Sequence, residues 1–212
     1  MALSSGDVGI EVGTRAEEIA RHTRHAKFVH DCGGLYLQII DKRPLGRPVV
    51  AADYKQLGVL LTEIGKRSAD LGVSLGYHHH VGSIGEAPDE IDRVLEAADP
   101  RYVKLILDVA HYFQGGGDPA AAIRRHHDRL LYLHIKDVVR PMPGSSDAKS
   151  FDFAELGRGQ VNLPAVFAAL QDTGFRGWAV VELDSDAGGP HSPKESAMLN
   201  KKYIEEKLGY PQ

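Results

Sequence analysis

The feature that most constrains this chain is a regular alternation of short apolar runs with longer segments of helical pattern. Each apolar run has the length and composition of a strand buried on both faces. The runs cover residues 34–40, 72–77, 102–107, 130–135 and 178–183. Strands that alternate with helices imply right-handed crossovers, so the sequence predicts an α/β fold with a parallel sheet.

The intervening segments carry helix signals. Leu57, Leu60, Leu61 and Ile64 recur at helical spacing and form one apolar stripe. Thr14 and Ser192 are each followed by Glu three positions later, a pattern that predicts capping boxes. The expected helices cover about 15–32, 52–71, 119–127, 163–174 and 193–207.

Length and charge limit the function classes. The 212 residues, 42% of them hydrophobic, suffice for one core, so we expect a single domain over 1–212. A net charge of -4 without a basic stripe disfavours nucleic acid. No apolar run is long enough for a membrane span and the start lacks a signal pattern, so we expect a cytoplasmic location and a small-molecule partner. Cys32, the single cysteine, is expected to be a small buried side chain in a helix.

Polar side chains interrupt four of the apolar runs at their carboxyl ends. These residues are His78, Asp108, His134 and Glu182. An open sheet gathers only the strands at its switch point, whereas a barrel brings all strand ends around one mouth. Four such ends therefore favour a barrel. Two imidazoles and two carboxylates suit Mn, Co, Fe or Zn, and they suit Mg less well.

Several motifs identify a family resemblance. "YHHHVGS", "LDVAHYFQGGGDP", "LYLHIKDV", "LGRGQVNLPAVFAAL" and "GFRGWAVVELD" occur in this order. They resemble the sugar isomerase and epimerase superfamily with a xylose isomerase-like TIM barrel, and within it proteins similar to inosose dehydratase. The resemblance implies that Asp108, His134 and Glu182 are metal ligands. The first ligand is commonly Glu in that superfamily, and His78 occupies the matching position in this sequence.

Neighbouring residues complete the expected site. Strand alternation places His78 and His80 on one side and His79 on the other, so His78 is expected at the metal and His80 either at the substrate or in a contact that orients a ligand. The resemblance implies that Glu182 is also a base and that His111 moves a proton. The other expected substrate contacts are Lys136, Asp137 and Arg158.

Some of these roles have alternatives. Lys136 could instead be a structural salt-bridge partner, and Arg158 could meet only solvent. Gln114 to Asp118 is expected to form a loop over the mouth. The remaining histidines are expected to be solvated on helix or loop surfaces. They are His22, His25, His30, His126, His127 and His191.

The expected chemistry is metal-assisted proton abstraction next to a carbonyl on a keto-sugar or cyclitol. The proton's destination then decides between epimerisation, isomerisation and dehydration. Counting back from residues 178–183 as the eighth strand leaves no room for the first two βα units of a (β/α)8 barrel. Such an open barrel exposes two edges, which predicts a homo-oligomer. The alternatives are a non-catalytic metal-binding fragment and an endonuclease acting at abasic sites.

Overall fold

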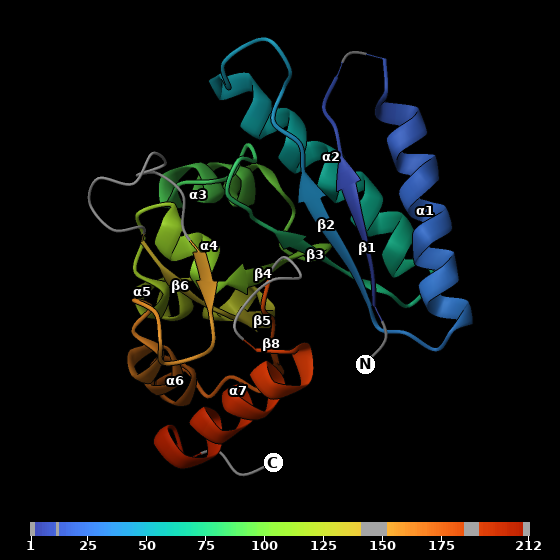
Figure 1. The fold of residues 1–212 in the computed structure, drawn as a ribbon. Helices are drawn as coiled ribbons and strands as arrows, with labels where there is room; N and C mark the ends of the chain where they lie inside the picture. Colours follow the sequence, from blue (N-terminus) through green and yellow to red (C-terminus); the bar gives the residue numbers. More distant parts are fainter. Residues whose placement is uncertain (1–2, 12, 141–151, 185–190, 210–212) are drawn as a thin grey trace.

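A curved sheet of parallel strands organises the protein, as a computed structural model shows for residues 3–11, 13–140, 152–184 and 191–209 (Figure 1). Its order is β1-β2-β3-β4-β5-β8, and every neighbouring pair is parallel. The strands are β1 (Leu3–Val8), β2 (Tyr36–Asp41), β3 (Ser74–His78), β4 (Val103–Asp108), β5 (Leu130–Ile135) and β8 (Trp178–Val181). The five predicted strands are thus confirmed, and β1 precedes them in the sequence.

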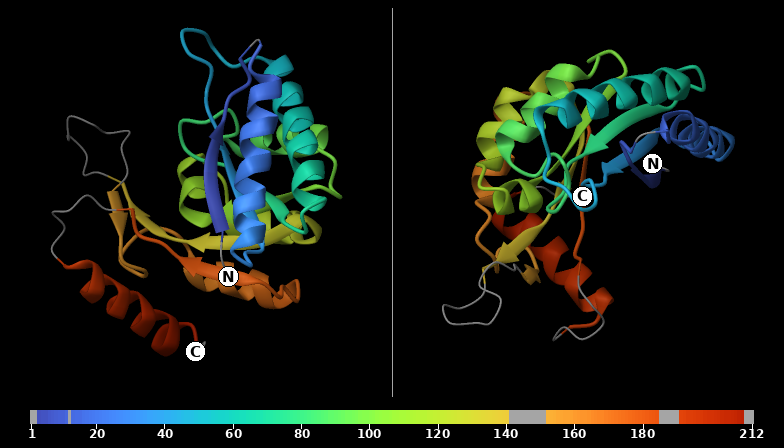
Figure 2. Two further views of the ribbon diagram at one scale, coloured as in Figure 1. Left: turned by 90° about the vertical axis from the view of Figure 1, so that its right-hand side faces the viewer. Right: turned by 90° about the horizontal axis from the view of Figure 1, so that it is seen from above.

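Helices alternate with the strands, and the five predicted helices are confirmed, whereas the helices at Pro88–Ala97 and Val109–Gln114 were not predicted. The helices are α1 (Arg15–Asp31), α2 (Ala51–Ala69), α3 (Pro88–Ala97), α4 (Val109–Gln114), α5 (Pro119–Arg125), α6 (Leu163–Asp172) and α7 (Pro193–Lys207), with a 3-10 turn at His127–Arg129. Helices α1, α2 and α3 lie side by side along one face of the sheet (Figure 2). The stripe of Leu57, Leu60, Leu61 and Ile64 faces that sheet and is buried, as expected. In the described part of the chain, no helix has the length and apolarity that crossing a membrane requires.

A short antiparallel hairpin was not predicted. It consists of β6 (Asp137–Val139) and β7 (Asp152–Ala154), with Val138 opposite Phe153. Three-residue strands carry too little alternation to stand out in a sequence. The hairpin follows β5 directly, so it lies at the carboxyl edge of the sheet.

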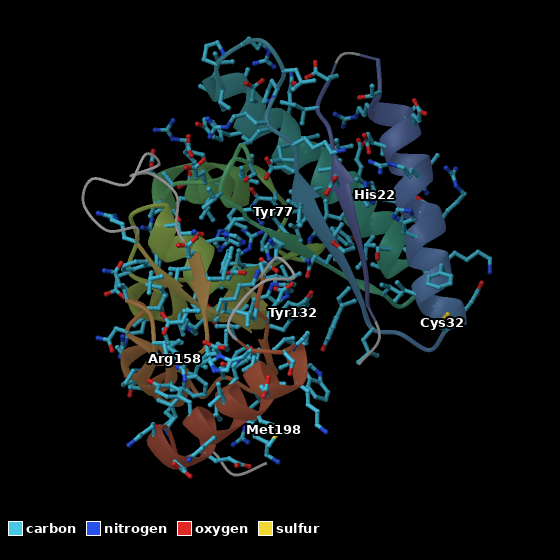
Figure 3. The ribbon with its side chains drawn as sticks, in the orientation of Figure 1. His22, Cys32, Tyr77, Tyr132, Arg158 and Met198 are labelled. Atoms are coloured by element: carbon cyan, nitrogen blue, oxygen red, sulfur yellow. The ribbon has the colours of Figure 1, made fainter. Side chains whose placement is uncertain are left out.

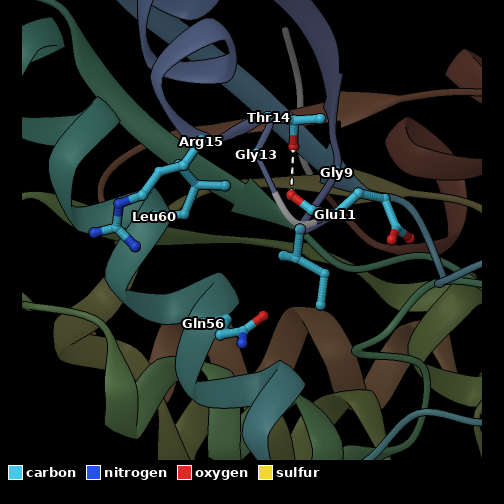
Figure 4. A pocket seen from close by; sticks show the side chains of 8 residues that line it. Gly9, Glu11, Gly13, Thr14, Arg15, Gln56 and Leu60 are labelled. Carbon is cyan, nitrogen blue, oxygen red and sulfur yellow. Dashed lines mark hydrogen bonds between the residues drawn. The ribbon is translucent and has the colours of Figure 1, made fainter.

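The two predicted capping boxes differ in outcome. Ser192 and Glu195 form one at the start of α7. Thr14 does not, because its hydroxyl donates to the carbonyl oxygen of Glu11 at 2.8 Å and is used in the preceding turn (Figure 4). This turn borders a pocket of about 220 Å³ between the β1–α1 loop and α2.

Two expectations about exposure are wrong. Cys32 is exposed because α1 ends at Asp31 and the thiol lies past its last turn (Figure 3). His22 is buried between α1 and β1, where a Cβ on Gly6 would come within 2.9 Å of the ring. The missing side chain of Gly6 is therefore what makes room for the imidazole.

Burial of His22 predicts acid sensitivity. Burial, together with the charge of Arg21, lowers the pKa of His22 from 6.5 to about 4. Between pH 6.5 and pH 4, the unfolded chain binds a proton at His22 that the folded chain does not bind. The free energy of unfolding therefore falls as the pH drops through this range, by up to about 3 kcal/mol. Urea unfolding across this pH range should show a shallower dependence for His22→Gln than for the wild type.

The control for this comparison lies on the same helix. His30 is exposed, so His30→Gln should keep the wild-type pH dependence. Identical slopes for His22→Gln and the wild type would contradict the assignment.

Candidate functional site

The strand register brings the predicted ligands to one edge. Asp108 and His134 are paired residues at the ends of β4 and β5, and His78 ends β3. Glu182 follows β8 directly, and its backbone N–H donates to the carbonyl oxygen of Ile135 at 3.2 Å. Because parallel strands end at the same edge, side chains far apart in sequence lie together here.

Three of the four predicted ligands form a tight group. The nearest ligand atoms of His78, Asp108 and His134 all lie within 4.8 Å of one another, and all three residues are buried. His78 Nε2 is 2.9 Å from His134 Nδ1, and these two nitrogens are 3.6 and 3.5 Å from Asp108 Oδ2. Glu182 reaches the group at His134, with its Oε2 2.9 Å from Nδ1.

These distances fit a divalent ion. Ligand atoms about 2.1 Å from a metal lie about 3.0 to 3.5 Å apart in octahedral or tetrahedral geometry. Among the described residues, the buried oxygens Asp108 Oδ2 and Glu182 Oε2 face imidazole nitrogens and the ammonium of Lys136. Buried carboxylate oxygens of this kind require positively charged partners. The donor set therefore suits a cation.

The electrostatics of the cluster favour ionised carboxylates. Burial acts to raise the pKa of Asp108, but His134 and His78, with the charges of His111 and Lys136, hold it well below 3.8. A hydrogen bond with His134 lowers the pKa of Glu182 to about 2. Burial acts to lower the pKa of His134, and the two carboxylates outweigh it and raise that pKa.

Lys136 belongs to the same cluster. Its ammonium lies 3.1 Å from Asp108 Oδ2, 2.9 Å from Glu182 Oε2 and 2.7 Å from Asp184 Oδ2. These carboxylates outweigh the effect of burial and raise the pKa of Lys136. Lys136 therefore supplies a permanent positive charge beside the candidate metal ligands. Asp184 was missed by sequence reasoning, although alternation two residues after Glu182 places it on the same side.

The three consecutive histidines diverge. His79 is fully buried against Tyr112, and its Nε2 accepts a hydrogen bond of 3.2 Å from the backbone N–H of Asp108. His80 lies on the other side, with its ring centroid 3.7 Å from that of His111. A cavity of about 460 Å³ opens beside His80 and is lined further by Asp7 of β1, by the end of β2 and by the segment that follows β2.

His111 borders the cluster on the side of Asp108. It is buried, and its Nε2 is 3.9 Å from Asp108 Oδ2. Burial lowers the pKa of His111 to about 4 against the opposing charge of Asp108. His111 is therefore not a solvated histidine at the start of its helix.

Residues 114–118 differ from the expected loop over the mouth. The backbone N–H groups of Gly115, Gly116 and Gly117 donate to carbonyl oxygens of α4, and Asp118 caps α5. The segment is a hydrogen-bonded turn between two helices.

Asp137 faces away from the cluster, in contrast to the predicted substrate contact. Its Oδ2 accepts the backbone N–H groups of Gly157 and Gly159, each at 2.9 Å. Its Oδ1 accepts those of Val138 and Val161, each at 3.0 Å. Strand alternation explains the direction, because His134 and Lys136 take the opposite side. The carboxylate thus holds the 157–161 segment.

Arg158 belongs to that segment. Its guanidinium is half exposed and lies 3.5 Å from Glu155 Oε2. Glu155 in turn accepts hydrogen bonds from His191 and Ser196. Among the described contacts Arg158 therefore pairs with a carboxylate of its own loop, and its predicted contact with substrate stays a prediction.

Replacement of Asp137 by Asn should destabilise the protein. An amide keeps one oxygen acceptor and turns its NH₂ group toward backbone donors, so at least two charge-assisted hydrogen bonds are lost. We expect a loss of about 3 kcal/mol of unfolding free energy in urea.

Asp152 provides the matched control, because it is exposed on β7. Asp152→Asn should change unfolding free energy by less than about 0.5 kcal/mol. Equal stability of the two variants would show that the Asp137 hydrogen bonds contribute nothing to folding.

One family of known proteins matches most of the chain. Residues 8–205 match the family described as Xylose isomerase-like TIM barrel. The inosose dehydratase of Lacticaseibacillus casei is 30% identical over an alignment of 217 residue positions. The alignment covers 92% of this chain and 72% of that protein.

Two solved structures share the fold. An L-ribulose 3-epimerase superposes with a TM-score of 0.76 at 15% identity, over 97% of this chain and 74% of that chain. The IOLI protein, whose crystal structure contains a bound zinc atom, superposes with a TM-score of 0.75 at 18% identity, over 95% of this chain and 74% of that chain.

Proposed function

From the premise that the chain belongs to the xylose isomerase-like TIM barrel family, we propose that it is a metal-dependent enzyme that abstracts a proton next to a carbonyl on a keto-sugar or cyclitol. The observation that carries the proposal is the convergence of His78, Asp108 and His134, with Glu182 beside them, at one edge of the sheet. The inosose dehydratase relative favours dehydration of an inosose as the reaction.

The cluster would hold a divalent ion through His78, Asp108, His134 and Glu182. The ion would act as a Lewis acid and polarise a bound carbonyl. The zinc in the IOLI protein supports a metal in this fold.

Glu182 is the proposed base. Its side chain is 40% exposed, whereas that of Asp108 is 0% exposed, so of the two carboxylates among the proposed ligands Glu182 is the more accessible to an incoming molecule. It is ionised at neutral pH because its pKa is about 2. It can therefore accept a proton from the carbon next to the carbonyl.

The surrounding residues complete the proton path. Lys136 carries a positive charge 2.9 Å from Glu182 and can stabilise negative charge that develops on substrate oxygen. His111 and His80 are placed to move the second proton, because their rings lie in contact beside the cluster. In a dehydration, the electron pair of the broken C–H bond would form a C=C bond as the β C–O bond breaks, and the departing hydroxide would take up the abstracted proton and leave as water.

Loss of the ligands should remove both metal and activity. Asp108→Ala and His134→Ala should each lower kcat/KM at least tenfold, or about 1.4 kcal/mol of barrier. Calorimetric titration with Mn²⁺ or Zn²⁺ should show weaker binding in parallel, and a chelator should abolish wild-type turnover of an inosose or keto-sugar panel.

Asp128→Ala and His127→Ala are suitable controls, because these exposed residues pair with each other and the only other described contact of the His127 ring is with the carbonyl oxygen of Arg124. They should keep wild-type metal binding and turnover. Wild-type rates in Asp108→Ala would remove that residue from the site. Metal binding without turnover on the whole panel would contradict the proposed activity and support a binding role.

Glu182→Gln separates the base from the metal group. The amide cannot accept a proton, so kcat should fall by about 100-fold or more. The group of His78, Asp108 and His134 remains, so Mn²⁺ should still bind in the calorimetric titration. Unchanged kcat in Glu182→Gln would refute the assignment of this residue as base.

A further inference from the structure

The imidazole of His111 is held in one orientation by its surroundings. Its ring lies between that of His80, at a centroid distance of 3.7 Å, and that of Phe153, at 5.7 Å edge to face. The backbone N–H of His111 donates to Asp108 Oδ1 at 2.9 Å, which fixes the start of α4. Rotation of the ring is therefore restricted on both faces.

One turn later on α4, Gln114 contacts the same ring. His111 Nδ1 lies 2.9 Å from Gln114 Oε1. An amide oxygen is only an acceptor, so Nδ1 must carry the hydrogen. A neutral imidazole has a single N–H, so Nε2 then bears a lone pair.

The other nitrogen faces the cluster. His111 Nε2 is buried, has no hydrogen-bond partner among the described residues and lies 3.9 Å from Asp108 Oδ2. In the opposite tautomer, Nε2–H would donate a hydrogen bond to a substrate carbonyl. With Nε2 as acceptor, the ring instead binds or removes a hydroxyl hydrogen.

We propose that Gln114 is a positioning residue that fixes the Nδ1–H tautomer of His111 and so makes its Nε2 a proton acceptor at the metal cluster. The catalytic consequence rests on the proposed function, whereas the tautomer is a property of the folded chain. Gln114 does not touch the cluster in any described contact and acts through His111. Sequence reasoning missed it, although its spacing of three residues on a helix was visible.

Imidazole NMR tests the tautomer without substrate. In protein labelled with ¹⁵N-histidine, long-range ¹H–¹⁵N correlations distinguish Nδ1–H from Nε2–H, and the His111 signals are those lost in His111→Gln. The wild type should show Nδ1–H. Gln114→Leu should lose this preference, and Gln114→Glu should retain it because a carboxylate also accepts.

Turnover tests the positioning role. Gln114→Leu should lower kcat about tenfold or more with KM changed less than about threefold, and Gln114→Glu should recover most of kcat. Gln171→Leu is the matched control, because Gln171 is exposed on α6, and it should behave as the wild type in both measurements.

The outcomes distinguish the tautomer of His111 from the role of Gln114 in turnover. An Nε2–H signal for wild-type His111 would overturn the proposal, even in an active enzyme. A lost preference in Gln114→Leu with unchanged kcat would overturn the positioning role. The expected tautomer in a protein inactive on every polyol would support the hydrogen-bond assignment and contradict the proposed function instead.

Discussion

The buried carboxylate of Asp108 is the constraint on which the rest of the site depends. It is fully buried at the end of β4, where an isolated charge would cost several kcal/mol. Its environment compensates with two imidazoles within 3.6 Å and the ammonium of Lys136 at 3.1 Å. The parallel register of β3, β4, β5 and β8 supplies these partners, since all four strands end at one edge. The convergence of the candidate metal ligands is therefore a consequence of the sheet topology.

The same residues also organise the surrounding structure. Asp108 Oδ1 caps α4, and that helix presents His111 to the cluster and Gln114 to His111. Alternation after β5 sends Lys136 toward the cluster and Asp137 to the opposite side, where it fixes the 157–161 segment. Phe153 of the hairpin then packs against His111 and lies 5.4 Å from the Lys136 ammonium. The chemistry and the local fold thus share single residues, which couples stability to activity in this region.

Strand and helix periodicity was sufficient to predict the parallel sheet, the helices α1, α2, α5, α6 and α7 and the strand ends that carry the polar cluster, but not α3 and α4. Contacts between distant segments were not predictable. The burial of His22 depends on Gly6 in the neighbouring strand, and no local pattern in α1 shows it. Cys32 lies one residue past a helix end, where boundaries are hardest to place. Asp137 was assigned to substrate by its position beside His134, whereas alternation already placed it on the other face.

The proposed metal site requires that side chains from separate strands share one cation. Anomalous diffraction from crystals of the Mn²⁺- or Zn²⁺-loaded protein tests it most directly. The account predicts a single strong peak about 2.0 to 2.3 Å from His78 Nε2, Asp108 Oδ2 and His134 Nδ1. A peak elsewhere in the molecule, with these three side chains unliganded, would contradict it.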